Sequence, residues 1–428
     1  MRVLLLSTTT GYQLRSFGDA ASRLGIELTF ATDRCHSLDD PWRDQAVPVR
    51  FHEEDESLRA IRRAAEERPI QGIVAVGDRP VVLAARAAEV LGVPGNPPDA
   101  AARSANKRLS RDSLVHAGLR VPPYFTVATT TDPRTVAWRA RYPVVVKPLG
   151  LSGSRGVIRA DSEEEFTVAL QRVYALLARK DVRALRLGLE HEILIEGFIE
   201  GREYAIEGIM TAGAFRPFAI FDKPDPLNGP FFEETIYVTP SRLPESAQAE
   251  IVREVGRAAA ALRLRHGPVH AECRVGPGGV FVLEVAARPI GGLCSKVLRF
   301  TRAGDTCGER LTYSLEDVLL RHAVGEDIAG FARETAAAAV MMIPIPQRGV
   351  LKRVDGTDAA RAVALVEDVH ITAKPDQLLE PLPEAGSYLG FIFARGPRAE
   401  DVDAAVRTAH ERLRFTIDPA IAVMTPGA

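Results

Sequence analysis

The chain has 428 residues, of which 46% are hydrophobic and 26% charged, and its 54 basic residues nearly balance its 56 acidic ones. This composition is typical of folded proteins, and the length corresponds to about two to four domains. A formal net charge of −2 disfavours a nucleic-acid or anionic-lipid partner. No apolar stretch reaches the ~18 residues of a membrane span. We therefore expect no nucleic acid and no membrane among its partners.

The N-terminus and the cysteines indicate the compartment. The apolar run at residues 2–6 is too short for the core of a signal peptide. The four cysteines, Cys35, Cys273, Cys294 and Cys307, show neither a CxxC pair nor the spacing of a metal site. In a chain of this size we expect reduced thiols. The sequence thus predicts a cytoplasmic protein.

The first 98 residues alternate between short apolar segments and helical ones. We expect strands at residues 2–6, 26–31 and 70–76, and helices at residues 12–24, 57–67 and 80–91. This alternation is typical of βαβ units, so it predicts an N-terminal doubly wound α/β domain. The first turn reads Ser-Thr-Thr-Thr-Gly and has no GxGxxG, which disfavours a nicotinamide dinucleotide site.

Two more units follow, which makes the chain a multidomain α/β and α+β protein. Within residues 99–335 we expect helices at 99–115, 163–178 and 245–264, β segments at 142–147, 192–199 and 203–210, and a β-hairpin over 269–286. Residues 336–428 read as a small C-terminal α+β domain of two strands and two helices.

A glycine-rich segment directly follows the strand that ends at Lys147. It reads Gly-Leu-Ser-Gly-Ser-Arg-Gly over residues 150–156. Glycines allow close backbone approach, so successive N–H groups can bind phosphate oxygens, and the lysine would add a point charge. The order differs from a Walker A motif, because the lysine precedes the glycines. A mobile surface loop is the alternative interpretation.

The hairpin carries the second signal. If Gly276 pairs with Val280 around a three-residue loop, Glu272 and Glu284 face each other on one side of the sheet. Two like charges so placed repel, and burial raises the cost. A divalent cation between them turns this repulsion into a net attraction, and oxygen ligands suit Mg²⁺ or Mn²⁺. The alternative is a solvated acidic pair on an outer face.

Arg288 comes four residues after Glu284 and precedes Pro-Ile-Gly-Gly, which ends in Gly291 and Gly292. An arginine beside a metal can hold a phosphoryl group or an oxyanion, helped by backbone amides. A surface arginine is the alternative.

Taken in order, these motifs resemble the ATP-grasp superfamily. The two lysines that hold nucleotide phosphates in this family correspond to Lys107 and Lys147. The flexible loop that closes over ATP corresponds to residues 150–156, with Ser152, Gly153, Ser154 and Gly156. This fold would be a two-lobed core with antiparallel sheets, and its nucleotide lid would span about residues 122–199.

Residues 194–203, Leu-Ile-Glu-Gly-Phe-Ile-Glu-Gly-Arg-Glu, resemble the hinge of the same family. The resemblance implies that Glu196 and the backbone of Phe198 and Ile199 meet adenine. It also implies that Glu203 accepts the ribose hydroxyls.

The family's metal-and-phosphate strand is matched by Glu272, Glu284 and Arg288. Ala286 stands where many relatives carry a metal-binding asparagine, which leaves the ligands of a second metal open. Residues 230–235, Pro-Phe-Phe-Glu-Glu-Thr, are similar to bacterial L-amino acid ligases, and the resemblance makes Glu234 a further metal ligand. The segment from about residue 348 onward also resembles the terminal domain of those ligases.

The resemblance implies an ADP-forming carboxylate–amine ligase that uses ATP and Mg²⁺, or Mn²⁺, to join two amino acids through an acyl phosphate. Lys147 would assist phosphoryl transfer, and Arg288 and the Gly291 amide would hold the oxyanion. The substrates would be small molecules, and relatives suggest a homodimer. Two alternatives stay open: an ATP-grasp enzyme for another acid and amine or for bicarbonate, and a nucleotide-binding protein without catalysis.

Three residues are candidates for substrate contact. His270 shares a strand face with Glu272, and a structural histidine is equally compatible with its position. Lys223 would meet a substrate carboxylate or phosphate, or be a solvated loop lysine. Gly292 offers no bulk, which predicts a roomy acyl pocket. Cys294 is expected to be a packing residue. The residues left without a role are Glu207, Arg79 and Asp78, for which helix capping is the alternative to ligand contact.

Overall fold

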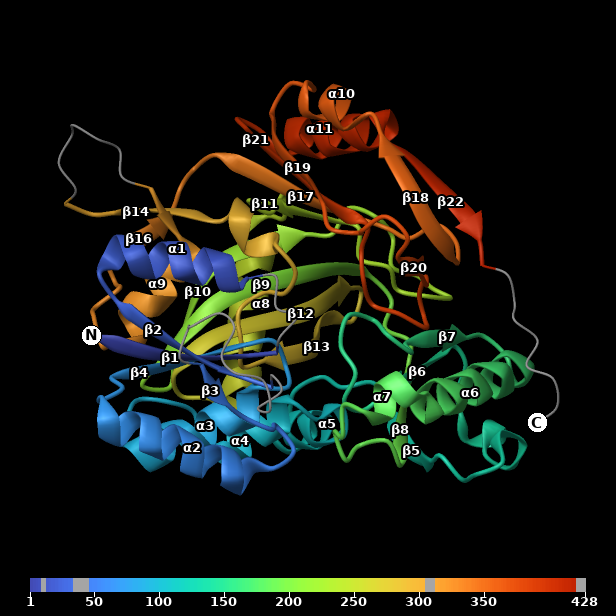
Figure 1. The fold of residues 1–428 in the computed structure, drawn as a ribbon. Helices are drawn as coiled ribbons and strands as arrows, with labels where there is room; N and C mark the ends of the chain where they lie inside the picture. Colours follow the sequence, from blue (N-terminus) through green and yellow to red (C-terminus); the bar gives the residue numbers. More distant parts are fainter. Residues whose placement is uncertain (9–12, 34–45, 305–311, 421–428) are drawn as a thin grey trace.

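The N-terminal part of the chain forms a parallel sheet. The computed structural model describes residues 1–8, 13–33, 46–304 and 312–420 (Figure 1). The sheet has the order β3-β2-β1-β4, with β1 (Arg2–Ser7), β2 (Glu27–Thr32), β3 (Val47–Pro48) and β4 (Gly72–Val76). All three pairings are parallel, which confirms the α/β expectation.

Helices cover both faces of this sheet. Alternate residues of β1 point to opposite faces, so they contribute to two separate cores. Leu4 and Leu6 share a core with α2 (Glu54–Glu67) and α3 (Val81–Leu91). Val3 and Leu5 share another core with α1 (Leu14–Leu24) and α9 (Leu315–Ala323). The second face is therefore completed by a helix from far along the chain.

Residues 99–115 do not form the single predicted helix. They divide into α4 (Pro98–Ser104) and α5 (Lys107–His116). The side chain of Asn106 caps α5 by accepting hydrogen bonds from the N–H groups of Arg108 and Leu109, which satisfies donors that a helix start leaves free. Lys107 is thus the first residue of a helix rather than a residue in its middle.

A four-stranded antiparallel sheet forms a separate lobe, shown in green at the lower right of Figure 1. It has the order β5-β8-β6-β7, with β5 (Tyr124–Ala128), β6 (Val144–Pro148), β7 (Ile158–Ala160) and β8 (Glu192–Gly197). The helices of this lobe are α6 (Glu163–Ala178), α7 (Lys180–Arg183) and the short 3-10 helices Pro133–Thr135 and Ala137–Arg139.

An eight-stranded sheet runs through the centre of the molecule in the order β13-β12-β9-β10-β11-β17-β21-β19. Its strands are β9 (Arg202–Thr211), β10 (Ala214–Asp222), β11 (Ile236–Thr239), β12 (Gly267–Gly276), β13 (Gly279–Ala286), β17 (Ala337–Ile343), β19 (Val366–Ile371) and β21 (Gly390–Gly396). The C-terminal part is therefore larger than the two expected strands and continues the central sheet through the β11–β17 pairing.

The remaining elements flank this sheet. The sheet β15-β14-β16 consists of β14 (Arg299–Arg302), β15 (Tyr313–Ser314) and β16 (Phe331–Arg333). The sheet β20-β18-β22 consists of β18 (Gly349–Asp355), β20 (Leu378–Leu379) and β22 (Arg414–Pro419). The other helices are α8 (Glu245–Ala261), α10 (Thr357–Arg361), α11 (Ala399–Arg412) and the 3-10 helix Cys294–Val297.

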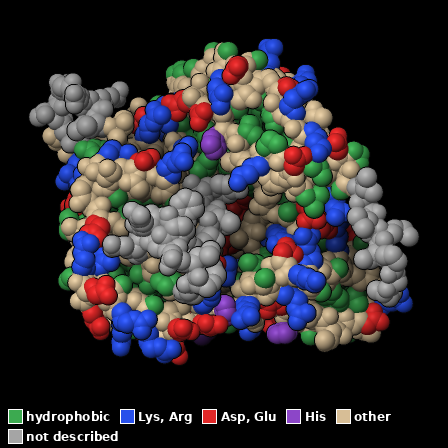
Figure 2. All heavy atoms as spheres, in the orientation of Figure 1, with side chains coloured by type: hydrophobic (Ala, Val, Ile, Leu, Met, Phe, Trp, Pro, Cys, Tyr) green, Lys and Arg blue, Asp and Glu red, His purple; other side chains and the backbone are tan. Residues whose placement is uncertain are grey.

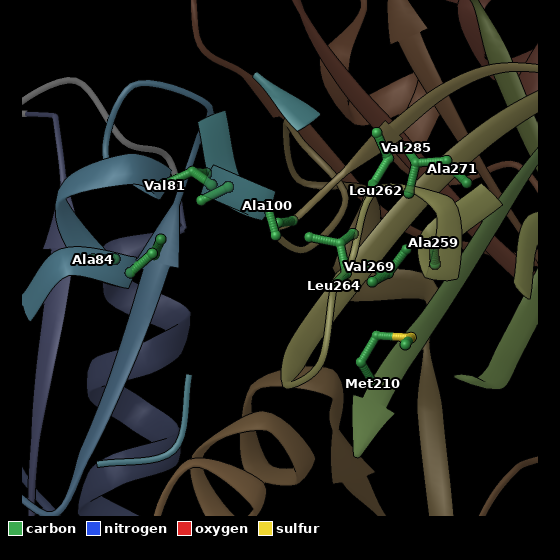
Figure 3. Close-up of a cluster of buried hydrophobic side chains, with 14 of the residues drawn as sticks. Val81, Ala84, Ala100, Met210, Ala259, Leu262, Leu264, Val269, Ala271 and Val285 are labelled. Carbon is green, nitrogen blue, oxygen red and sulfur yellow. The ribbon is translucent and has the colours of Figure 1, made fainter. Parts of the chain in front are cut away.

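One hydrophobic core joins the N-terminal domain to the central sheet. Figure 3 shows Val81 of α3 and Ala100 of α4 on one side and Leu262, Val269 and Val285 on the other. This contact fixes the loop after β4 relative to the hairpin, and that loop carries Asp78.

The molecular surface agrees with the balanced composition. On the face seen in Figure 2, basic and acidic side chains are interspersed and do not gather into one large patch of a single sign. Within the described residues, we find no helix that is long and apolar enough to cross a membrane.

Candidate active site

A cavity of about 290 Å³ lies where the N-terminal domain, the lobe of β5–β8 and the central sheet meet. Every site residue predicted from the sequence lines it except Gly156 and Lys223. The predicted residues on its wall are Lys107, Lys147, Ser152, Gly153, Ser154, Glu196, Phe198, Ile199, Glu203, Glu234, His270, Glu272, Glu284, Arg288, Gly291 and Gly292. Positions spread over almost 190 residues thus converge on one space.

The hairpin places Glu272 opposite Glu284, as predicted, but the pairing that leads to this differs from the predicted one. The turn has two residues, and Gly276 pairs with Gly279 rather than with Val280. That tighter turn alone would set the two glutamates on opposite faces. A β-bulge at Leu283 shifts the register by one residue and returns them to the same face.

Three carboxylates surround the ammonium of Lys223. Its Nζ lies 2.8 Å from Glu203 Oε1, 2.7 Å from Glu234 Oε1 and 3.0 Å from Glu272 Oε1. One oxygen from each of these glutamates lies within 4.8 Å of the others. The side chain of Lys223 is only 3% exposed, so the interpretation as a solvated loop lysine is wrong.

The charges of this cluster shift one another's pKa values. Burial, together with the neighbouring Glu272 carboxylate, raises the pKa of Glu234 to about 7. Burial opposes the charged form of Lys223, but the three carboxylates outweigh it and raise its pKa well above the usual value. Lys223 is therefore a permanent cation at neutral pH.

Lys107 and Lys147 both line the cavity. Lys107 Nζ donates to the carbonyl of Leu151, at 2.7 Å, and so touches the glycine-rich loop. Lys147 forms an ion pair with Glu196, whose carboxylate also accepts from Arg111 Nε at 2.8 Å. Two cations therefore lie at the end of the cavity nearest the loop.

The carboxylate of Glu196 is engaged by two cations, and its expected contact with adenine stays a prediction. The resemblance assigns it to adenine, but Lys147 and Arg111 bind its carboxylate. Burial would raise its pKa, and these two cations lower it to about 2. In this structure Glu196 holds two basic side chains in place, and a pairing partner for Lys147 could not be read from the local pattern.

An apolar slot lies beside these cations. The rings of Phe198 and Phe232 stack with centroids 6.4 Å apart, and Val145 and Leu283 also line the cavity there. The backbone of Phe198 and Ile199 is already partly hydrogen-bonded. The Phe198 N–H donates to the carbonyl of Pro143, and Arg274 donates to the Ile199 carbonyl. A flat aromatic base fits the chemistry of such a slot.

The glycine-rich loop rests on the C-terminal part of the chain. Gly156 adopts φ +76° and its N–H donates to the carbonyl of Pro383 at 2.9 Å. A Cβ at Gly156 would lie 2.6 Å from Pro148 Cγ, so this position requires glycine. Arg155 donates to the carbonyl of Glu384 at 2.7 Å. Gly156 thus shapes the loop from outside the cavity wall.

Arg288 crosses to the N-terminal domain. Its Nε and Nη2 lie 2.7 and 3.3 Å from the two carboxylate oxygens of Asp78. Burial would raise the pKa of Asp78, but Arg288, with smaller help from Lys107 and Ser152, lowers it below its usual value. Asp78 therefore anchors Arg288, and its side chain makes no helix cap.

A second buried pair supports the same turn. His270 Nδ1 lies 3.2 Å from Glu207 Oε2, and the Ile290 N–H donates to that oxygen at 3.1 Å. Burial lowers the pKa of His270, but Glu207 and Glu272 offset this and raise it. Glu207 therefore joins the strand of His270 to the segment that carries Gly291.

A further part of the cavity wall is mostly apolar and includes Tyr237, Cys294, Met342 and Tyr388. Cys294 is a buried free thiol whose Sγ lies 3.8 Å from Met342 Sδ, and burial raises its pKa, as expected of a packing residue. Cys273 is also free and buried. Cys35 and Cys307 lie outside the described residues.

Sequence reasoning missed several residues of the wall. Arg111 lies one helical turn after Lys107, so the i, i+4 spacing on α5 could have indicated it. Arg274 follows Glu272 by two residues on the same face of β12, and its Nε lies 3.1 Å from Glu203 Oε2. Ala286 pairs with His270 in the hairpin and offers no ligand atom. Arg79, also left without a role, pairs with Asp33 at 3.0 Å.

Comparisons with known proteins agree with this architecture. Family models match residues 18–95 as an ATP-grasp N-terminal domain, residues 140–297 as an ATP-grasp domain and residues 341–418 as L-amino acid ligase C-terminal domain 2. The chain therefore belongs to the ATP-grasp superfamily.

One solved structure and two relatives show in more detail what the chain is similar to. The structure is similar to the crystal structure of L-amino acid ligase from Bacillus licheniformis, with a TM-score of 0.80 and 27% identity, over 98% of this chain and 99% of that chain. An uncharacterized protein of Sinorhizobium fredii is 25% identical over 98% of this chain and 84% of its own length. Alanine–anticapsin ligase of Bacillus subtilis is 29% identical over 55% of this chain and 52% of its own length.

Proposed function

We propose that this protein is an ADP-forming carboxylate–amine ligase that joins two amino acids into a dipeptide. The observation that carries the proposal is the convergence on one cavity of three cations, Lys107, Lys147 and Arg288, with a cluster of carboxylates. The similarity to L-amino acid ligases supports the substrate class.

The donor set fits a divalent cation of the Mg²⁺ type. Glu203, Glu234 and Glu272 present only carboxylate oxygens, close to one another around the ammonium of Lys223, and Glu284 faces Glu272 across the hairpin. Hard cations such as Mg²⁺ and Mn²⁺ take oxygen ligands and are commonly shared with nucleotide phosphates. When bound, the ion would supply charge neutralisation at the phosphates.

Two displacements would form the amide. An oxygen of the acid's carboxylate attacks the γ-phosphorus of ATP, the bond to the bridging oxygen breaks and ADP leaves. The amine nitrogen then attacks the carbonyl carbon of the acyl phosphate, phosphate leaves, and phosphate can take the proton that the nitrogen loses. Lys107 and Lys147 would align the phosphates, and Arg288 with the Gly291 amide would hold the oxyanion.

The glycine-rich loop has a clear purpose in such a reaction. An acyl phosphate hydrolyses when water reaches it, so a loop that covers the cavity protects the intermediate. Ser152, Gly153 and Ser154 of this loop line the cavity wall.

The test is a matrix of amino-acid pairs incubated with the protein, ATP and Mg²⁺. We expect phosphate release that depends on both amino acids, together with the dipeptide mass in the product. ATP hydrolysis stimulated only by bicarbonate or by a nucleotide-type amine would replace this function with another ATP-grasp activity. No hydrolysis with any pair by a folded protein that binds ATP would reject catalysis.

A further inference from the structure

Lys223 lies where four neighbouring strands of the central sheet meet. It directly follows β10, while Glu203 is on β9, Glu272 is on β12 and Glu234 lies two residues before the start of β11. These strands are consecutive in the sheet, in the order β12-β9-β10-β11. The ammonium therefore connects side chains that the backbone brings near one another but that have no attraction of their own.

The bonding of this ammonium is complete. A lysine has three N–H donors, and each of the three carboxylates accepts at 2.7 to 3.0 Å. The ring of Tyr237 lies on another side, with its centroid 4.9 Å from Nζ, a distance at which a ring face attracts a cation. A buried charge with all its donors paired is a fixed part of the site and not a group waiting for substrate.

The charges around the cavity give this fixed cation a consequence. Four carboxylates stand together on the wall: Glu203, Glu234, Glu272 and Glu284. Lys223 is bonded to three of the four and Arg274 to Glu203, and His270 Nε2 lies 3.8 Å from Glu272 Oε1. With His270 neutral, Lys223 and Arg274 are the two cations of this cluster. When all four acids are ionised, two negative charges remain, which one divalent ion neutralises. Without Lys223 three negative charges would remain, more than one divalent ion neutralises.

We propose that Lys223 is a positioning residue that occupies the place of one cation among Glu203, Glu234 and Glu272. It holds these three carboxylates together. Because of it, the nucleotide-free protein binds one divalent ion fewer than the same carboxylates would bind without the lysine. This inference rests on the proposed function, because it assumes that the same carboxylates bind the metal of the ligase reaction.

The experiment counts Mn²⁺ ions bound to the full chain without nucleotide, by electron paramagnetic resonance of the free ion during a titration. We expect Lys223→Met to bind one more Mn²⁺ per chain than the wild type. Lys223→Arg, which keeps the cation, should bind the wild-type number. Lys352→Met, which removes a partly exposed lysine outside the cavity, is the matched control. An unchanged number of ions in Lys223→Met would overturn the proposal.

A second variant keeps the test decisive if Lys223→Met folds poorly. In Lys223→Met/Glu234→Gln one positive and one negative charge are removed together, so the net charge of the cluster is restored and the wild-type number of ions is expected. An extra ion in this double variant would contradict the charge argument. If the wild type ligates amino acids but the ion count never changes, only this inference fails. If the wild type binds Mn²⁺ and ATP but ligates nothing, the proposed function fails instead.

Discussion

Asp78 and Arg288 form a bidentate ion pair although they lie 210 residues apart in the chain. Asp78 belongs to the loop after β4 of the N-terminal domain, and Arg288 follows the hairpin of the central sheet. The planar guanidinium is thereby fixed by one edge beside the cavity. The orientation of the group proposed to hold the oxyanion is thus set by a different domain.

This relationship predicts the effect of removing the guanidinium. Arg288→Ala should keep nucleotide affinity, because Lys107, Lys147 and the glycine-rich loop remain. Amide formation should fall by about 100-fold to 1,000-fold, the usual cost of losing an oxyanion donor. Calorimetric binding of ATP analogues beside dipeptide formation would check both statements. An unaffected coupling rate would exclude the role assigned to Arg288.

Asp78→Asn tests the orientation of Arg288 by a milder change than Arg288→Ala. The amide keeps the shape of the side chain but removes its charge, so Arg288 stays present and loses only its anchor. We expect a loss of kcat smaller than that of Arg288→Ala, with little change in the KM for ATP. Equal losses in the two variants would show that Asp78 does more than orient Arg288.

Glu284→Ala should abolish ATP turnover while the fold stays intact. Glu284 is half-buried on the cavity wall and faces Glu272, so its loss removes a metal-facing carboxylate without opening a core. We expect turnover at least about 100-fold lower and an unchanged circular dichroism spectrum. Glu411→Ala, at an exposed position of α11, is the control. Wild-type turnover by folded Glu284→Ala would refute the assignment.

The lobe of β5–β8 is tied to the C-terminal part by a bidentate ion pair. Arg172 Nε and Nη2 lie 2.6 and 2.9 Å from the oxygens of Glu384. Reversing one charge, as in Glu384→Arg, should raise the KM for ATP by up to about fivefold, the range that exposed pairs reach. Restoring the pair with Arg172→Glu should recover it.

A charge reversal on another exposed pair separates this effect from a general change of surface charge. Asp401 in the first turn of α11 pairs with Arg398, the residue just before the helix, with oxygen and nitrogen 2.6 Å apart. Asp401→Arg should leave the KM for ATP unchanged. A KM that rises equally in both reversals would mean that the Arg172–Glu384 pair does not hold the lobe.

Two stacked histidines predict a loss of stability in mild acid. The rings of His266 and His322 lie 4.1 Å apart. Burial, and then His266, lowers the pKa of His322 from 6.5 to about 4. The unfolded chain therefore binds a proton that the folded chain refuses between these values, so this contribution to stability is present above pH 6.5 and is lost as the pH falls toward 4.

We expect His322 to account for on the order of 1 kcal/mol of this loss. His322→Gln removes the titrating ring and should flatten the dependence of the unfolding free energy on pH between 6.5 and 4. His116→Gln, at an exposed position, should keep the wild-type slope. A wild-type slope in His322→Gln would assign the pH dependence to other groups.

Local patterns in the sequence predicted most of the elements and the membership of the site. The glycine-rich loop, the hairpin glutamates and the residues 194–203 each carry their chemistry within a few neighbours, and all meet at one cavity. The position of α6 was also predictable, because a capping serine and three acids begin it.

What the sequence could not predict depends on distant contacts. The bulge at Leu283 leaves no mark on the alternation of the strand, yet it decides on which face Glu284 lies. Asp222-Lys223-Pro224 reads as an exposed loop, and only the three carboxylates from other segments show that Lys223 is buried. The ion pair of Glu196 could not be predicted locally either, because Glu196 is on β8 and its partner Arg111 is on α5, far away in the chain.

The pairing of β11 with β17 has a consequence for dissecting the molecule. Ile236 lies opposite Met341 and Val238 opposite Ala339, and the two β11 side chains are almost completely shielded from water. A fragment ending before residue 337 would leave β11 as an exposed edge strand with unpaired backbone amides and hydrophobic side chains, which favours aggregation. Anyone seeking a minimal catalytic piece should therefore keep the final ninety residues.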